Sequence, residues 1–268
     1  MKKILVALLM VVLLFSLCAC GVNSNSFMSR SQVNSLSKEF SGVQAVLTLT
    51  YESNGKTIDM KVTYDLLLDQ APIAVTRFIQ IANDGGYDGT RVDTYNSTYK
   101  YVVMGRYGQK DDSDGKKKYY DFRSHDVTFA GEFKQNGYRA PKGGYAEFEL
   151  YSLAMYHVNE GEEFNSANGA FILDLSGEDS GLNSANYAVF AKFASMTILT
   201  DGEVTTQPTT SKRPQLSDKL VRLTSTTSRT VYDAHGENPT SIKIASNEVT
   251  VTVEILGDYD WSKLPIIR

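Results

Sequence analysis

The chain has 268 residues, of which 42% are hydrophobic and 22% are charged, and its formal net charge at pH 7 is −4. This length is ample for one buried core and fits one or two domains. The mild negative charge gives no electrostatic reason to expect binding to nucleic acid or to anionic lipid.

The N-terminus predicts export and lipid attachment. Two lysines precede an apolar run over 4–15, which is typical of a secretory signal peptide and is shorter than the roughly 20 residues that span a bilayer. The sequence Leu-Cys-Ala-Cys at 17–20 resembles a bacterial lipobox, in which the last cysteine is lipidated and becomes the first mature residue. We therefore expect a signal peptide over 1–19, a lipid anchor at Cys20 and a location on the extracytoplasmic face of the cell membrane.

The segment after the anchor is rich in Ser and Asn and poor in apolar residues. It predicts an anchor and flexible tether over 20–42, followed by one folded domain over 43–268. Both cysteines of the chain precede this domain. The domain therefore has no disulfide and must be stabilised by its core.

The domain begins with a hairpin and a helix. Apolar residues alternate over 45–51 and 58–68 on either side of Asn54-Gly55, which predicts two strands joined by a tight turn. Pro72 marks the start of a helix, because apolar residues recur after it at helical spacing until Asn-Asp-Gly-Gly at 83–86 stops it.

The rest of the domain predicts a mostly-β fold. Short strands are expected at 99–104, 127–129, 145–155, 170–175, 187–193 and 249–256. The charged segment 110–118 predicts a solvated loop, 200–215 predicts an exposed linker, and 216–223 predicts a short late helix. Many short strands with two helices favour a closed barrel or a sandwich.

The order of several motifs resembles the cyclophilin family. Asp-Leu-Leu-Leu-Asp-Gln-Ala-Pro at 65–72, with Gly-Tyr-Asp-Gly-Thr at 86–90, is similar to the opening of a cyclophilin. Similar segments follow in the family's order at 102–105, 131–133, 153–155, 165–172 and 187–192. The resemblance covers about 45–256. It implies a closed eight-stranded antiparallel barrel capped by two helices, and peptidyl-prolyl cis–trans isomerase activity (EC 5.2.1.8) with no cofactor.

The resemblance also implies which residues form the site. In cyclophilins an arginine donates a hydrogen bond to the proline nitrogen as the amide twists, and Thr94 stands in its place here. Met104 replaces a glutamine that orients the substrate, and Tyr187 or Asn186 falls at the position of a histidine. The implied substrate-binding residues are Tyr101, Met104, Phe171, Leu182 and Tyr187.

Two nearby arginines are candidates for a relocated donor. Because side chains alternate along a strand, Arg91, three residues from Thr94, should point to the opposite face. Arg106 follows the glycine at the end of the next motif and is the stronger candidate. Loss of one transition-state hydrogen bond lowers a rate by about 10²–10³, so we expect weak or absent activity.

Two classes of function stay open. One is an isomerase acting on exported polypeptides, where slow X-Pro isomerisation limits folding. The other is a non-catalytic module that binds proline-containing or unfolded segments, as a chaperone or assembly partner. The expected partners are proline-containing segments of exported proteins and the membrane through the lipid anchor. The three histidines have no metal-site spacing, and the sequence leaves the oligomeric state open.

Overall fold

The computed structural model describes residues 26–111, 115–139, 144–157, 165–177, 182–209, 226–245 and 249–267. The predicted signal peptide, the predicted lipidation site Cys20 and the short helix predicted at 216–223 lie outside the described residues.

The described part is mostly β, with its strands in one twelve-stranded sheet. The strands are β1 (Gln44–Ser53), β2 (Lys56–Leu66), β3 (Thr90–Asn96), β4 (Tyr101–Asp111), β5 (Lys117–Asp121), β6 (Leu153–Met155), β7 (Phe171–Asp174), β8 (Val189–Thr200), β9 (Glu203–Thr209), β10 (Thr226–Tyr232), β11 (Thr240–Ala245) and β12 (Thr250–Leu256). The helices are α2 (Arg30–Glu39) and α3 (Pro72–Asn83), and short 3₁₀ turns lie at Lys134–Asn136 and Trp261–Lys263.

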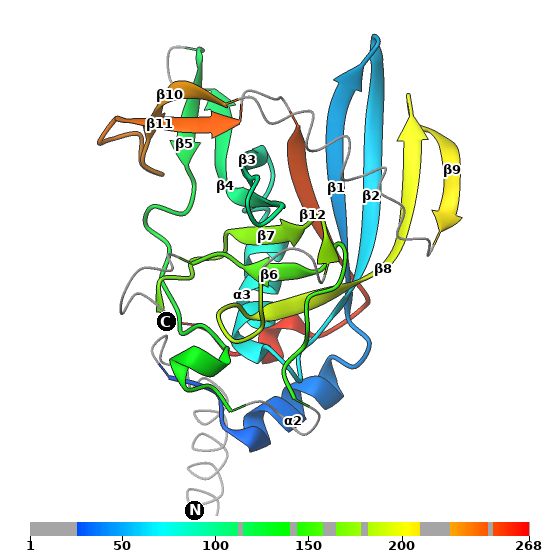
Figure 1. Ribbon diagram of the computed structural model, residues 1–268, viewed down its shortest axis with the longest axis vertical. Helices are drawn as coiled ribbons and strands as arrows, with labels where there is room; N and C mark the ends of the chain where they lie inside the picture. The colour runs from blue at the N-terminus through cyan, green and yellow to red at the C-terminus, as the bar shows by residue number, and fades with distance from the viewer. Residues whose placement is uncertain are drawn as a thin grey trace, which may run out of the picture.

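Eight of these strands close into a ring. Their order is β4-β3-β12-β1-β2-β8-β6-β7, and a pairing between β4 and β7 completes the circuit. Each pairing in the ring is antiparallel. The expected closed arrangement of eight antiparallel strands is therefore confirmed (Figure 1).

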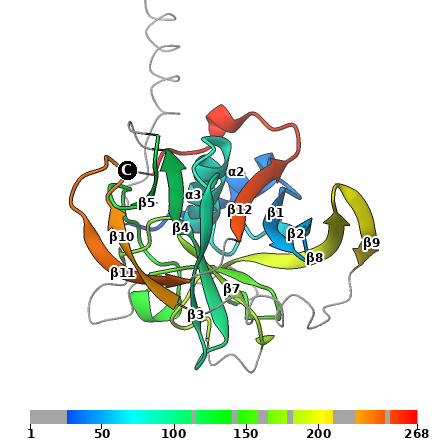
Figure 2. The same ribbon diagram turned by 90° about the horizontal axis from the view of Figure 1, so that it is seen from above.

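The other four strands extend the ring on opposite sides. Strand β5 continues the sheet from β4 and is followed by β10 and β11, whereas β9 pairs with β8. Figure 2 shows β10 and β11 on one side of the ring and β9 on the other. The interpretation of 200–215 as a linker is therefore wrong for Glu203–Thr209, which forms β9. The charged segment 110–118 likewise contributes the end of β4 and the start of β5.

The first hairpin follows the prediction closely. β1 and β2 pair from Gln44 with Asp65 to Ser53 with Lys56, and buried residues alternate along both strands. Asn54 and Gly55 both have positive φ, of 54° and 72°, as the tight turn of a two-residue hairpin requires. The final predicted strand is also confirmed, because β12 lies between β1 and β3 and closes that side of the ring.

Helix α3 confirms the predicted start at Pro72. The buried side chain of Glu132 caps its first turn, since the amides of Ile73 and Ala74 donate to the two carboxylate oxygens at 3.0 and 2.9 Å. Burial raises the pKa of Glu132 to about 8, although these two hydrogen bonds act in the opposite direction. Glu132 thus holds the first turn of the helix, and the helix packs against β8 and β12 of the ring.

Helix α2 lies in the segment expected to be a flexible tether, so that prediction is wrong for residues 30–39. Ser29 and Gln32 form a capping box at its N-terminus. Val33 and Leu36 are buried, and the ring of Phe40 lies 5.6 Å from both Tyr259 and Trp261. The second helix of the described fold is thus at the N-terminal side of the domain.

Two predicted strands are shorter than expected. Of the segment 145–155, only Leu153–Met155 forms a strand. The segment 127–129 contributes a single bridge between Phe129 and Ala167.

The largest cluster of buried side chains, which we call the main core, joins α2 and α3 to the ring strands.

Candidate functional site

A second apolar cluster lies on β4, β6, β7 and β8, separate from the main core. We call it the outer cluster. Its buried members are Tyr101, Val103, Phe148, Ala154, Ile172, Leu182 and Val189. Tyr156 and Tyr187 are partly buried and pack against it. Rings and branched side chains at partly exposed positions offer an apolar surface to a ligand.

The structure brings three of the five predicted binding residues together. Tyr101 and Leu182 belong to the outer cluster, where they are 8% and 9% exposed, and Tyr187 packs against it. Met104 and Phe171 are not with them, because both are fully buried in the main core. Their side chains therefore belong to the main core and form no part of the outer cluster.

Strand alternation explains this division. Val103 pairs with Ile172, and Met104 pairs with Phe171. Neighbouring residues of a strand point to opposite faces, so Val103 and Ile172 share the face of Tyr101. Phe171 points the other way and makes edge-to-face contact with Phe78 at 5.6 Å. Ile172 occupies the place in the outer cluster that the sequence assigned to Phe171.

Thr94 lies beside the outer cluster. It pairs with Val103 across β3 and β4, and directly opposed residues point to the same face of a sheet. Thr94 is partly buried. The position implied for the catalytic arginine thus carries a short hydroxyl in place of a guanidinium.

The two candidate arginines have different surroundings. Arg91 donates to Gln109 Oε1 at 2.6 Å, and its guanidinium lies over the ring of Tyr119. Tyr119 belongs to a third, small cluster under β10 and β11. Arg106 is held by Asp121, to which its Nε and Nη2 donate at 3.0 and 2.8 Å. Within the described part of the chain its Nη1 makes no hydrogen bond.

Local backbone geometry directs Arg106 away from the core. Gly105 has a φ of +82°, and a Cβ atom there would meet the rings of Tyr87 and Phe171 at 2.8 and 3.0 Å. Gly105 therefore faces the main core directly after Met104, which breaks the alternation of the strand. The following residue, Arg106, points outward and is 31% exposed at its side chain.

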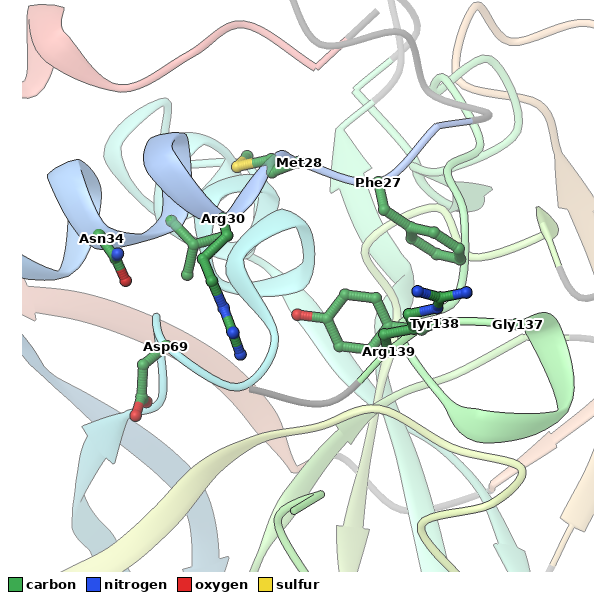
Figure 3. A pocket seen from close by; sticks show the side chains of 9 residues that line it. Phe27, Met28, Arg30, Asn34, Asp69, Gly137, Tyr138 and Arg139 are labelled. Atoms are coloured by element: carbon green, nitrogen blue, oxygen red, sulfur yellow. The ribbon is translucent and has the colours of Figure 1, made fainter. Parts of the chain in front are cut away.

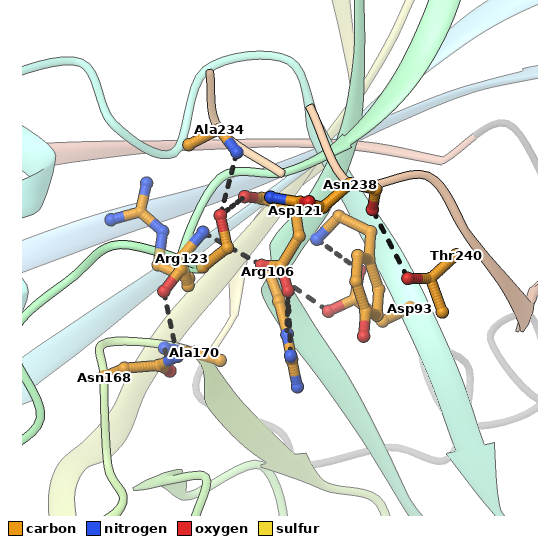
Figure 4. Close-up of polar contacts among 11 residues, drawn as sticks. Asp93, Arg106, Asp121, Arg123, Asn168, Ala170, Ala234, Asn238 and Thr240 are labelled. Carbon is orange, nitrogen blue, oxygen red and sulfur yellow. Dashed lines mark hydrogen bonds and ion pairs between the residues drawn. The ribbon is translucent and has the colours of Figure 1, made fainter. Parts of the chain in front are cut away.

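Asp93 fixes the same stretch of backbone from β3 (Figure 4). Its carboxylate accepts hydrogen bonds from the amides of Arg106 at 3.3 Å and Tyr107 at 3.1 Å. Burial raises the pKa of Asp93 well above its usual range, and the two amide donors and the Arg106 charge oppose that shift. Sequence reasoning missed both Asp93 and Asp121, because no motif sets an isolated aspartate in a strand apart from a surface residue.

Three tyrosines connect Arg106 to the outer cluster. The guanidinium of Arg106 lies 4.9 Å from the ring centroid of Tyr107. Burial raises the pKa of Tyr107 to about 12, and Tyr156 contributes to the rise. Burial also raises the pKa of Tyr101, and Tyr156 contributes there too. Tyr156 thus lies near both phenols, which places hydrogen-bond donors beside an apolar surface.

A buried histidine, His157, lies next to Tyr187. The buried ring of His157 stacks between Phe133 at 4.9 Å and Tyr187 at 4.8 Å. Its Nε2 lies 2.7 Å from the carbonyl oxygen of Asn186. His157 therefore fixes the segment that carries Tyr187, a role that the sequence did not indicate.

Among the residues that the structure describes, no group of three or more His, Cys, Asp or Glu side chains is arranged to hold a metal ion. Of the described helices, none is long and apolar enough to cross a membrane.

The ring of eight antiparallel strands is the cyclophilin-like fold that the resemblance implied, and the sequence comparison agrees. Residues 50–225 match the family model described as cyclophilin type peptidyl-prolyl cis-trans isomerase. The chain belongs to the cyclophilin-type peptidyl-prolyl cis–trans isomerase family. The enzyme class expected from the sequence, EC 5.2.1.8, is thus confirmed at the level of the family.

Solved structures with a similar fold are distant in sequence. A crystal structure of a Cryptosporidium parvum cyclophilin type peptidyl-prolyl cis-trans isomerase matches 81% of this chain and 99% of its own, with 12% identity and a TM-score of 0.42. A second structure of that protein, in the presence of the dipeptide Ala-Pro, matches 80% of this chain and 99% of its own, with 11% identity and a TM-score of 0.39. No curated protein matches the chain.

Proposed function

We propose that this protein is a lipid-anchored cyclophilin that binds proline-containing segments of exported polypeptides and isomerises them slowly. One observation carries the proposal. The outer cluster brings Tyr101, Leu182 and Tyr187 together, whereas the position implied for the family's arginine holds Thr94, and the outward guanidinium of Arg106 is paired with Asp121. The lipobox at 17–20 supports the anchor and the extracytoplasmic location.

The chemistry explains why binding and catalysis can separate. Resonance in the X-Pro amide creates a barrier that a catalyst lowers by stabilising the twisted form, in which the proline nitrogen becomes basic. Apolar residues hold the proline ring in both the ground state and the transition state, so they contribute mainly to affinity. A hydrogen-bond donor aimed at the nitrogen acts only in the transition state, so its position decides the rate.

Arg106 is the donor that the geometry favours. It points outward from the same strand as Tyr101 and Val103, and its Nη1 is unbonded within the described residues. Burial alone would lower the pKa of Arg106, but the hydrogen bond to Asp121 raises that pKa above its usual value. The guanidinium therefore stays charged, and Asp121 limits how far it can turn toward a bound peptide.

The test is cis–trans exchange of a proline peptide, measured by NMR exchange spectroscopy with residues 21–268. We expect a weak acceleration that Arg106→Ala abolishes, with a loss of up to about 10²–10³ for a single donor. Arg91→Ala is the matched control, because Arg91 contacts Gln109 and Tyr119 and lies at the third cluster. Equal loss in both variants, or full activity in Arg106→Ala, would refute the role of Arg106.

Thr94 favours a second candidate function, a module that binds without catalysis. In that case the exchange rate of the peptide is unchanged by the protein, while amide resonances near Ile172 and Tyr187 shift on peptide addition. Substitution of the buried Leu182 of the outer cluster by Asp should then abolish these shifts, because a carboxylate cannot be buried against a proline ring without cost.

A further inference from the structure

A cavity of about 640 Å³ lies between helix α2, Asp69 and the segment 137–139. It is lined by Phe27, Met28, Arg30, Val33, Asn34, Asp69, Gly137, Tyr138 and Arg139. None of these residues belongs to the outer cluster, so the cavity is distinct from the candidate isomerase site. Its volume is within the range of pockets that bind small ligands, roughly 300–1,000 Å³.

The cavity combines apolar walls with two free cations (Figure 3). Met28, Val33 and Tyr138 are buried, and the rings of Phe27 and Tyr138 lie 5.0 Å apart. Arg30 and Arg139 are exposed, and within the described residues neither guanidinium makes a hydrogen bond or an ion pair.

The arginines outnumber the acids of the lining. Asp69 is the one carboxylate among the lining residues that the structure describes. Arg30 lies close enough to the phenol of Tyr138 to lower its pKa, although burial keeps that pKa above its usual value. Guanidinium groups bind phosphate oxygens in a bidentate manner. Two guanidiniums beside apolar walls therefore suit a phosphate group joined to an apolar body.

Several residues that line the cavity lie close to Cys20 in the sequence, which indicates the source of that ligand. The described fold begins at Ser26, six residues after Cys20. Six residues span at most about 20 Å, and Phe27, Met28 and Arg30 of the lining follow directly. If Cys20 is lipidated, as proposed above, the cavity is held within reach of the phospholipid headgroups. Charges further than about 8 Å away are screened, so the two local arginines matter more than the negative net charge.

We propose that this cavity binds the phosphate of a membrane phospholipid headgroup through Arg30 and Arg139, with the glycerol and first acyl carbons against its apolar walls. The inference rests on the lipid anchor of the proposed function. A single flexible attachment leaves a domain free to rotate, whereas a second contact fixes its orientation. The cavity would thus determine which way the outer cluster faces at the membrane surface.

The test uses the full lipidated protein in nanodiscs of three compositions: phosphatidylcholine, phosphatidylglycerol, and digalactosyldiacylglycerol, which has no phosphate. Arginines are modified with phenylglyoxal, and the rate at each position is read by mass spectrometry. We expect Arg30 and Arg139 to react about fivefold more slowly in both phospholipid discs than in galactolipid discs, since one arginine–headgroup contact is worth roughly a fivefold change in affinity. Exposed Arg229 on β10 is the control and should react equally in all three.

Variants and a soluble anion make the outcome decisive. Arg30→Gln should return Arg139 to its galactolipid rate, whereas Arg229→Gln should leave it protected. Equal rates in all three discs, or equal protection of Arg229, would overturn the proposal. So would protection in galactolipid discs by inorganic phosphate alone, which would make free phosphate the ligand. If mass spectrometry of the mature N-terminal peptide finds no lipid on Cys20, the lipid anchor on which this proposal rests is refuted. The exchange experiment on proline peptides tests the isomerase function separately and would be unaffected.

Discussion

At the scale of single residues, Gly105 separates the core from the candidate site. Its positive φ lets two successive residues, Met104 and Gly105, face the main core, and only then does the chain turn Arg106 outward. Without this irregularity, alternation would place Arg106 on the core face. A residue without a side chain thus decides whether the guanidinium of Arg106 points outward.

Replacement of Gly105 by alanine should destabilise the protein by about 2–5 kcal/mol. The left-handed conformation costs a side chain about 1–2 kcal/mol, and the new Cβ would also meet the fully buried rings of Tyr87 and Phe171, where overpacking costs about 1–3 kcal/mol. Gly42→Ala is the matched control, because Gly42 has a similar φ of +72° and no atom within 4 Å of the added Cβ. Urea denaturation measures the free energy of unfolding of both variants. Equal losses would show that the steric contact contributes nothing.

The residue scale is also where sequence reasoning about the site fails. β7 is buried on both faces, so Phe171 and Ile172 carry no difference in polarity that would say which of them faces the outer cluster. The pairing of Ile172 with Val103 decides it, and pairing is a property of the folded sheet. The assignment of Thr94 to the position of the family's arginine comes from a motif and its spacing in the sequence, and it stays a prediction. The partners of Arg106 could not, since Asp121 is 15 residues away.

At the scale of elements, α2 shows how local signals can be outweighed by composition. Ser29 and Gln32 have the spacing of a capping box, and Val33, Leu36 and Phe40 recur at helical spacing. The surrounding serines and asparagines nevertheless favour a tether. The helix is stable because its apolar stripe meets Tyr259 and Trp261 near the other end of the chain, a contact that no local window contains.

Phe40→Ala should therefore cost about 3–5 kcal/mol, as expected for removal of a fully buried ring. Trp261 is the single tryptophan of the chain and stacks on Phe40, so its fluorescence should shift to longer wavelength as water reaches it. The exposed Ser35 of the same helix provides the control, and Ser35→Ala should change stability by less than about 0.5 kcal/mol. A harmless Phe40→Ala variant would restore the flexible-tether interpretation.

At the scale of the whole molecule, the ring and its extensions differ in how they are held. β1 pairs along its length with both β2 and β12. Among the described residues, β10 pairs with the ring side of the sheet through Val231 and Tyr232, which pair with β5. The order of the family motifs was enough to predict the ring. The β10–β11 extension has few apolar residues and no motif, so its place in the sheet follows only from the structure.

This difference predicts two levels of local stability. Amides of β10 and β11 should exchange with deuterium more than about tenfold faster than those of β1 and β2, because opening a hairpin that rests on the small third cluster needs only part of the global unfolding free energy. Hydrogen exchange with mass spectrometry measures this directly. Low concentrations of urea should accelerate exchange in β1 and β2 and leave β10 and β11 almost unchanged, since the urea dependence scales with the surface exposed by each opening. If both hairpins exchange at one rate with one urea dependence, the extension and the ring unfold as a single cooperative unit, and the pairing through Val231 and Tyr232 is enough to couple them.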